Sequence, residues 1–403
     1  MYVKRKDAII AFKVFSDAEL NMHHIVPGTI LDTKSMTSDD KRMFTVFKHA
    51  EDAISLAVHM CMQTAGCARY AYNWGLDKWS KQYEAWKADS SLEEPNWVNI
   101  SRQWTQEKPE WANKTARSAV TCSLSNLGTA FKNFIRRKAK YPKKHKRSQG
   151  ISFQLGNDTC SIEGNRIRLP IIDCVKLREQ PRFQGKIAGY TVQLIASHWY
   201  VTVAFDCPDV PKEAPESVVG IDVGLQHPAV ASDGTKLELP LEKLQKLEAK
   251  KRRAQRALSR SKRNSKSKER KRTKLQRIQQ RITNIRQDAA HKFTTTVCKN
   301  HATVVTEDLN INELKAKAPA RSVRRAYNSS LMGLILFQIS YKAVHHIKAP
   351  KYFPSTKRCS TCGHIKEAMP PNIRTYHCDH CGAHLDRDEN AARNLMLQPW
   401  VTR

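Results

Sequence analysis

The first half of the chain alternates between two hydrophobic periods. Apolar residues return every three or four positions over residues 44–86 and again over residues 114–138, which predicts two amphipathic helices. Residues 8–14 and several short runs between 151 and 206 instead alternate apolar and polar side chains, with many β-branched and aromatic residues, as strands do. We therefore expect a small antiparallel barrel or sheet, which the first strand could close, with the helices inserted into it.

In the second half, acidic residues interrupt or end apolar runs. Residues 218–224 and 302–309 are apolar runs that each contain a carboxylate in the middle or at the end, and residues 228–231 form a further short run after a turn. Residues 240–292 carry leucine and isoleucine at helical spacing, which predicts a long helical hairpin. Three prolines within residues 208–215 mark the boundary between the two halves. The pattern favours an α+β protein with more than one domain.

The net charge of the chain indicates which kind of partner it binds. Its 403 residues include 69 lysines and arginines against 38 acidic residues, a formal net charge of +31. Such an excess attracts polyanions, and the release of phosphate counterions supplies much of the free energy of binding. The excess is densest between residues 243 and 292, where 20 basic residues stand against three acids. A charged run can be simply a solvated face, but this density favours contact with a nucleic-acid duplex. The candidate contact residues are Lys250, Arg252, Arg253 and Arg256.

Four of the 11 cysteines form two tight pairs. Cys359 and Cys362 make one CxxCG segment, and Cys378 and Cys381 make another, with 15 residues between the pairs. This spacing lets four thiolates bind one tetrahedral Zn²⁺ ion, and four thiolates leave no open position for catalysis. The role of the site is therefore expected to be structural. The other seven cysteines are scattered among apolar residues, which indicates core thiols in a reducing compartment.

Three acidic residues stand where an ionised side chain needs a counter-charge. Asp222 interrupts one apolar run, Glu307 ends another, and Asp388 begins a helix that contains small alanines. Any one of them alone could be a helix cap or half of a salt bridge. Three carboxylates brought together need cations, and two Mg²⁺ or Mn²⁺ ions would also hold the attacking and leaving oxygens of a phosphodiester. We therefore predict that these three acids bind the metal ions and are catalytic.

The segments around these acids resemble the three split RuvC motifs of TnpB, the transposon-encoded RNA-guided nuclease family related to the small type V CRISPR effectors. The cysteine pairs lie between the second and third motifs, as in that family. The resemblance implies an RNase H-like (RuvC) α/β domain with an inserted zinc ribbon, and an N-terminal β-barrel, called the wedge, with a helical recognition insertion. It also places the third catalytic acid at Asp388 and not at Asp386. The matching segments are Gly220-Ile221-Asp222-Val223-Gly224, Thr306-Glu307-Asp308-Leu309-Asn310 and Asp386-Arg387-Asp388-Glu389-Asn390-Ala391-Ala392.

The resemblance extends over the N-terminal half and implies a division of the chain into six segments. In the family, the exposed helix face before Ser123 reads a short motif beside the DNA target, which points here to Arg117 and Thr121, with Asn157 in a loop that could help. Residues 16–42 depart from the family and have no assigned role. The implied segments are 1–43, the first wedge strand and an irregular stretch; 44–140, the recognition helices; 141–215, the wedge barrel; 216–350, the RuvC-like domain with the basic hairpin; 351–385, the zinc ribbon; and 386–403, the end of the RuvC-like domain.

The activity that this resemblance implies is RNA-guided cleavage of double-stranded DNA by a two-metal mechanism. A transposon-associated non-coding RNA would pair with the target, and the protein would read only a short flanking motif. An unguided RNase H-like transposase or resolvase and a compact type V CRISPR effector fit the same residues. A guided repressor without cleavage is a further alternative, against which the intact set of acids argues.

The expected cofactors and partners follow from this activity. We expect Mg²⁺ or Mn²⁺ together with Zn²⁺, a guide RNA, a double-stranded DNA target, and a monomeric ribonucleoprotein or a dimer. The expected location is the prokaryotic cytoplasm, at the nucleoid when the protein is bound to DNA. A membrane-spanning helix needs about 20 consecutive apolar residues, and no apolar run in the sequence is nearly that long. The first residues also lack the layout of a signal peptide. We therefore expect no membrane association.

Overall fold

The structure is a computed structural model of the chain, and it describes residues 7–16, 50–177, 185–206, 213–370 and 372–397. The chain divides into two compact units, residues 1–209 and 210–403. Most of the irregular stretch predicted for residues 16–42 lies outside the described residues. No helix in the described ranges is both long enough and apolar enough to cross a membrane.

The first unit contains a four-stranded antiparallel sheet in the order β1-β7-β6-β2. β1 (Asp7–Ser16) pairs with β7 (His198–Asp206), which pairs with β6 (Lys186–Ile195), which in turn pairs with β2 (Ile151–Leu155). Alternate residues of β7 are buried, so one face of the strand packs in the core and the other does not. The strands predicted from the period-two pattern are therefore present, and the first of them lies beside β7.

A second, three-stranded sheet completes the β-structure of this unit. It consists of β3 (Ser161–Glu163), β4 (Arg166–Leu169) and β5 (Asp173–Lys176) in sequential order. Side chains of both sheets share one hydrophobic core, which includes Ile167 of β4 and Trp199 of β7. In the described ranges no strand of one sheet pairs with a strand of the other, and closure into a barrel stays a prediction.

Three helices, α3 (Ala50–Ala88), α4 (Trp97–Glu107) and α5 (Arg117–Ile135), pack together beside these sheets. α3 corresponds to the helix expected over residues 44–86, of which the structure describes only the part from residue 50. The helix expected from residue 114 begins at Arg117, because residues 110–114 form a separate 3₁₀ turn. Close packing of α3 on α5 depends on Gly75, where an added Cβ would lie 2.8 Å from Leu124 Cδ2.

The second unit is built on a four-stranded mixed sheet in the order β11-β10-β8-β9. β10 (Thr303–Thr306) is parallel to both β11 (His345–Lys348) and β8 (Val218–Asp222), and β9 (Val230–Ala231) runs antiparallel to β8. The strands predicted within residues 218–224, 228–231 and 302–309 are thus confirmed. Their nearly continuous apolar sequences match their burial, because helices cover the central strands of a parallel sheet.

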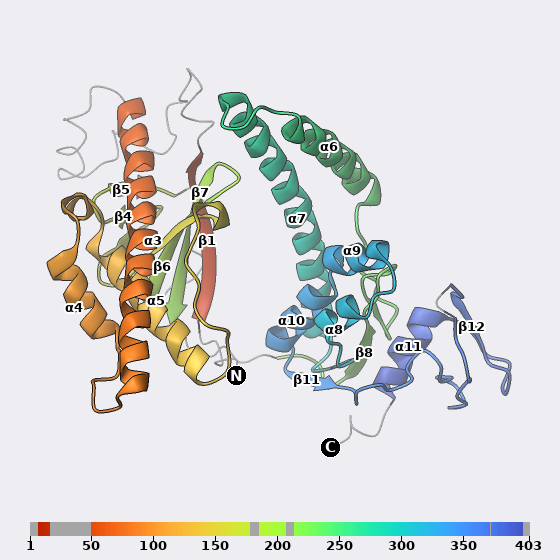
Figure 1. The fold of residues 1–403 in the computed structure, drawn as a ribbon. Coiled ribbons are helices and arrows are strands. Elements are labelled where there is room, and N and C mark those ends of the chain that lie inside the picture. Colours follow the sequence, from red (N-terminus) through yellow and green to blue (C-terminus); the bar gives the residue numbers. More distant parts are fainter. Residues whose placement is uncertain (1–6, 17–49, 178–184, 207–212, 371, 398–403) are drawn as a thin grey trace. The chain divides into compact units, whose positions relative to one another are not determined.

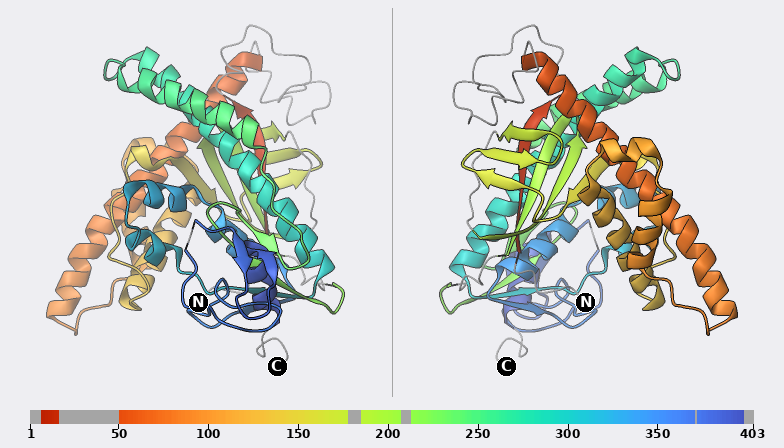
Figure 2. Two further views of the ribbon diagram at one scale, coloured as in Figure 1. Left: turned by 90° about the vertical axis from the view of Figure 1, so that its right-hand side faces the viewer. Right: turned by 90° about the vertical axis from the view of Figure 1, so that its left-hand side faces the viewer.

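The basic hairpin consists of α6 (Leu241–Ser259) and α7 (Lys266–Asn300), which lie side by side in every view (Figures 1 and 2). Leu244 and Leu247 of α6 pack on Ile282 of α7, as the leucine and isoleucine spacing predicts. α7 extends beyond the predicted end near residue 292, because its last turns pack in the core of the unit with α10 (Met332–Lys342). Two short helices precede α10, and two short strands lie in the cysteine-rich segment: α8 (Ile311–Ala316), α9 (Arg321–Ser329), β12 (Thr375–His377) and β13 (His384–Asp386).

The last described helix, α11 (Arg387–Met396), lies directly on the backbone of β8. The contact is centred on Gly220, where an added Cβ would overlap the carbonyl oxygen of Ala392 and lie 2.8 Å from the backbone nitrogen of Met396. Ala391 and Ala392 are fully buried in this contact. Glycine on the strand and alanines on the helix therefore let two backbones approach more closely than larger side chains would allow.

We predict that Gly220→Ala lowers the free energy of unfolding by about 1–3 kcal/mol, because the new methyl group overpacks a contact between two backbones. Urea unfolding of the purified protein measures this effect. The matched control is Gly333→Ala in the first turn of α10, where the nearest atom to an added Cβ is 3.9 Å away. The control should be neutral or more stable by up to about 1 kcal/mol, and equal stability of both variants would contradict the prediction.

Candidate functional site

The three predicted acids come from separate elements that meet at one edge of the mixed sheet. Ile221 of β8 is paired in parallel register with Thr306 of β10, so Asp222 and Glu307, each the next residue along, leave the sheet at the same carboxyl edge. Asp388 lies in the first turn of α11, one helical turn before Ala392, which contacts β8 at Gly220. The structure thus brings all three acids to the end of β8.

The electrostatics of this cluster link the three acids. Burial, and then the negative charges of Glu307 and Asp388, raise the pKa of Asp222 to about 8, although Arg387 lowers it in part. Burial also raises the pKa of Glu307, and the hydroxyl of Ser355, which donates a hydrogen bond to Glu307 Oε1, opposes this shift. A divalent cation would compensate the charge of Asp222 and its acidic neighbours, although among the described residues only the four cysteines have ligand atoms that all lie within 4.8 Å of one another.

Asp386 and Asp388 have different surroundings. The Asp386 side chain is exposed and caps α11, accepting hydrogen bonds from the backbone amides of Asp388 and Glu389, each at 3.0 Å. The side chain of Asp388 is only 13% exposed, and its Oδ1 lies 3.7 Å from Arg374 Nη1. Asp386 therefore satisfies the backbone amides at the N-terminus of α11, whereas Asp388 is close enough to Asp222 for its charge to raise the pKa of Asp222.

Ser355 is a site residue that sequence reasoning missed. It is buried, it follows β11 by seven positions, and its hydroxyl holds Glu307. Its own position depends on Asn394 of α11, whose Nδ2 donates to the carbonyl oxygens of Ser355 at 2.9 Å and of Arg358 at 2.6 Å. The helix that delivers Asp388 thus also anchors the segment that orients Glu307.

Asn390, one turn earlier on α11, makes the equivalent attachment to the first cysteine pair. Its Nδ2 donates to the carbonyl oxygen of Arg358 at 2.8 Å, and its Oδ1 accepts from the backbone amide of Ser360 at 2.9 Å. Asn390 and Asn394 are both buried. Two asparagines four positions apart on the buried face of a helix are the sequence signal that could have found this connection.

The four predicted cysteines form one cluster. The sulfur atoms of Cys359, Cys362, Cys378 and Cys381 all lie within 4.8 Å of one another. Cys359 Sγ is 3.7 Å from Cys381 Sγ, and Cys362 Sγ is 3.6 Å from Cys378 Sγ. Four sulfurs around a zinc ion at ~2.3 Å in tetrahedral geometry are about 3.8 Å apart. The donor set and its spacing therefore fit Zn²⁺.

Both cysteine pairs have the same backbone turn. The amides of Gly363 and Gly382 donate to the carbonyls of Cys359 and Cys378, each at 3.0 Å, and both glycines have a positive φ, of 80° and 71°. Burial alone would raise the pKa of the Cys359 thiol, but backbone amides that donate to its sulfur lower the pKa to about 6. The first turn thus favours the thiolate form of Cys359 that binds metal. At Cys362 and Cys381 a donating backbone amide is outweighed by the neighbouring sulfurs and by burial, which raise the pKa of each thiol.

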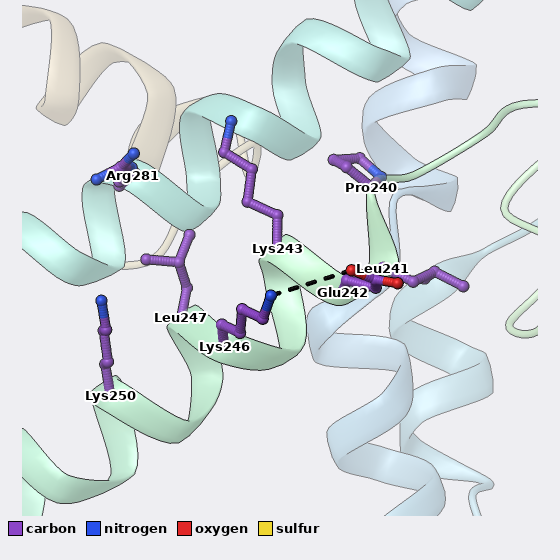
Figure 3. Close-up of a pocket in the computed structure, with 8 residues that line it drawn as sticks. All are labelled: Pro240, Leu241, Glu242, Lys243, Lys246, Leu247, Lys250 and Arg281. Atoms are coloured by element: carbon purple, nitrogen blue, oxygen red, sulfur yellow. Dashed lines mark ion pairs between the residues drawn. The ribbon is translucent and has the colours of Figure 1, made fainter.

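The predicted contact residues of the basic hairpin are all exposed. Lys250, Arg252, Arg253 and Arg256 project from α6 into solvent. Figure 3 shows Lys243, Lys246 and Lys250 of α6 with Arg281 of α7 around an open hollow of about 520 Å³, in which Lys246 pairs with Glu242 at 4.0 Å. Lys243 and Arg281 were not singled out from the sequence, because their proximity depends on how the two helices pair.

Arg117, Thr121 and Asn157 lie on the surface of the first unit. Arg117 and Thr121 are one turn apart at the start of α5, and the Thr121 hydroxyl donates to the Arg117 carbonyl at 3.3 Å. The turn that contains Asn157 lies near this end of α5. Burial raises the pKa of Cys122 in α5, and the charge of Asp158, the residue after Asn157, raises it further, so Asp158 must be close to Cys122. A polar hollow that the sequence did not reveal lies between α3, α5 and β2, with Arg69, Asn126, His145, Lys146 and Gln154 in its lining.

Three family profiles match parts of the chain. Residues 200–318 match the OrfB_IS605 profile, described as "Probable transposase", and residues 334–395, which include the cysteine cluster and α11, match the Cas12f1-like TNB domain. Residues 58–87 match the helix-turn-helix domain associated with OrfB_IS605. In this structure those residues belong to one uninterrupted helix, α3.

Similar proteins cover most of the chain. The protein named "Putative RNA-guided DNA endonuclease InsQ" of Escherichia coli K12 is 31% identical over 82% of this chain and 86% of its own length. A Streptomyces pristinaespiralis protein named "Putative RNA-guided DNA endonuclease" is 28% identical over 83% of this chain and 84% of its own length. The solved Cas12f1–sgRNA–target DNA complex contains a chain with a TM-score of 0.56 and 15% identity, covering 99% of this chain and 100% of that one, which indicates a shared fold.

We predict that the purified protein holds about one zinc ion per chain, bound by the four thiolates. Cys362→Ser should release this zinc and lower the thermal stability of the second unit, because a structural metal site contributes its binding free energy to folding. Metal analysis by mass spectrometry and thermal melts measure both effects. Cys122→Ser, which changes a cysteine outside the cluster, is the control. Equal zinc content in the two variants would contradict the assignment.

We predict a pH-dependent gain in stability for Asp222→Asn in buffer free of Mg²⁺ and Mn²⁺. With a folded pKa of about 8, against an ordinary value near 4, Asp222 binds its proton more tightly in the folded than in the unfolded state. The metal-free protein therefore loses stability as the pH rises from 4 to 8. Asparagine mimics the protonated acid, so the variant should melt several degrees higher than the unsubstituted protein at pH 8, and the difference should shrink at pH 5.

The same melts with added Mg²⁺ test the metal-binding role. Mg²⁺ should raise the melting temperature of the unsubstituted protein and should have little effect on Asp222→Asn. A melting temperature that is the same for both proteins at pH 5 and pH 8, and that does not respond to Mg²⁺, would show that the acids are not a cation site.

Proposed function

Because the chain belongs to the TnpB family, which includes the OrfB proteins of IS605 transposons, we propose that it is an RNA-guided endonuclease that cuts double-stranded DNA. The observation that carries this proposal is the meeting of Asp222, Glu307 and Asp388 at one edge of a parallel strand pair. These acids stand in a chain with a net charge of +31. The names of the relatives, which cover more than four fifths of the chain, support the guided activity.

In this proposal the three acids hold two Mg²⁺ or Mn²⁺ ions. Such ions, when bound, activate the attacking water and stabilise the leaving oxygen of the scissile phosphodiester. The chain's own contribution is to keep the donors in place. Asp222 is held by its strand, Glu307 by the Ser355 hydroxyl, and Asp388 by the packing of α11 on β8. Arg374 and Arg387, near Asp388 and Asp222, place positive charge beside the acids.

We further propose that the two units follow the architecture of the family. The second unit would be the RNase H-like RuvC domain, interrupted by a zinc ribbon over residues 351–385 and completed from residue 386. The first unit would combine a wedge barrel with an inserted recognition domain over residues 44–140. The mixed sheet of the second unit and the fold shared with the Cas12f1 chain support this division.

The exposed cations of the hairpin would contact the guide RNA and its duplex with DNA, because their charge attracts phosphates without reading sequence. The surface at the start of α5, with Arg117, Thr121 and Asn157, would contact the DNA that flanks the target. Base pairing with the guide would supply the rest of the specificity. In this proposal the particle is one protein chain with one guide RNA.

A second candidate is the unguided transposase, which the "Probable transposase" description of the matching profile favours. It differs from the proposed function in one measurable respect, since it would need no RNA. A compact type V CRISPR effector would share the chemistry and the requirement for RNA, and it would differ in the source of the guide.

The decisive experiment expresses the full chain with its native flanking DNA, sequences the co-purifying RNA and tests cleavage of a matching duplex. We predict guided cutting that requires Mg²⁺ or Mn²⁺ and that falls by roughly a thousandfold or more in Asp222→Ala, because a metal ligand is lost. Glu216→Gln, which changes an exposed acid away from the cluster, is the control and should cut normally. Cutting that survives removal of the RNA would favour the unguided transposase, and cutting by Asp222→Ala would refute the site.

A further inference from the structure

A cavity of about 300 Å³ opens directly beside Glu307. Its walls come from the segment after β10, from α8 and from the turn that follows β11. Four apolar residues are among those that line the cavity, and Glu307 of the acid cluster lines it as well. These apolar residues are Leu309, Leu314, Pro350 and Phe353. A molecule in this cavity would therefore touch both an apolar wall and the proposed catalytic site.

Tyr352, which also lines the cavity, combines two features that are unfavourable for the folded chain. Its side chain is 81% exposed, the largest exposed fraction among the exposed large hydrophobic residues of the described ranges. Its φ is 68°, in the left-handed region that bulky residues rarely adopt. Neither feature adds to the packing of a hydrophobic core. Strained backbone and an exposed aromatic ring at the mouth of a cavity together are typical of a ligand-binding position.

The charged residues at the rim are already paired with one another. Glu313 of α8 binds Lys317 Nζ at 2.7 Å and Lys351 Nζ at 3.7 Å, and Asp308 binds Lys348 Nζ at 2.9 Å. Lys351 Nζ also lies 5.4 Å from the centre of the Tyr352 ring. Because each of these lysines already has an acidic partner, the cavity favours a neutral planar group over a further phosphate.

We propose that this cavity binds one unstacked nucleobase of the DNA strand that is being cut, with the Tyr352 ring stacked on the base. This inference rests on the proposed nuclease function and adds to it a positioning contact. The base would belong to a nucleotide close to the scissile phosphate, because Glu307 lines the same cavity. Stacking on an aromatic ring accepts every base, so the subsite would position the strand without selecting its sequence.

The test is a double-perturbation cycle, in which the Tyr352 ring, the DNA base, or both are removed and the cleavage kinetics are compared. Pre-opened target duplexes, each with one abasic nucleotide near the cut, are cleaved by the full chain with its guide RNA. For the unsubstituted protein, one abasic position should raise the concentration for half-maximal rate by about five- to a hundredfold, with little change in the maximal rate. Tyr352→Asn should show the same increase with the intact strand and no further increase at that abasic position.

The variants separate stacking from folding. Asparagine tolerates a positive φ, so Tyr352→Asn removes the ring without adding backbone strain. Tyr352→Phe keeps the ring and should behave as the unsubstituted protein. Tyr341→Asn removes another exposed tyrosine, on α10, and should leave the abasic profile unchanged.

The outcomes distinguish this inference from the proposed function. If the unsubstituted protein cuts with its guide but the abasic profile is the same in Tyr352→Asn, the nucleobase subsite is refuted and the nuclease function stands. If the unsubstituted protein cuts no guided target at all, the proposed function fails, and the subsite fails with it.

Discussion

The backbone contact between α11 and β8 at Gly220 is the constraint on which the acid cluster depends. A helix can deliver a side chain beside a strand end only if its axis lies close to the sheet, and here the carbonyl of Ala392 occupies the space that a strand side chain would need. Asp388, one turn away, then lies close enough to Asp222 for its charge to add to the rise in the pKa of Asp222 that burial causes. Larger residues at Gly220 or Ala392 would move the acid and the charge it contributes.

The same helix connects the cysteine cluster to the acids. Asn390 holds the backbone beside Cys359, Asn394 holds that of Ser355, and Ser355 holds Glu307. Each link is a hydrogen bond made by a buried side chain, that of Asn390, Asn394 or Ser355, and losing the partner would leave that side chain unsatisfied in the interior. The cysteine cluster, whose proposed metal has a structural role, is therefore connected to the proposed catalytic acids through the backbone beside Cys359 and through α11.

Local sequence rules predicted the parts of the site that carry their own signal. Asp222 and Glu307 were found because an acid in an apolar run is costly, and the cysteines because two CxxCG segments specify a metal site by spacing alone. The hairpin followed from its leucine and isoleucine period. Asn390 and Asn394 carried a signal in their spacing that was not used, whereas Ser355 and Tyr352 could not be found in this way. Their importance depends on which distant segments meet, and neither periodicity nor composition contains that information. For the same reason, the extension of α7 into the core of its unit was missed.

The order of the three acids along the chain has a consequence for protein synthesis. Asp222 and Glu307 emerge from the ribosome long before Asp388, and the strand pair that bears them can form while α11 is still being made. The basic hairpin also precedes α11, so the surface proposed to bind RNA is complete before the acid cluster is. Under the proposed function, a nascent chain could therefore bind RNA at the hairpin before α11 completes the acid cluster.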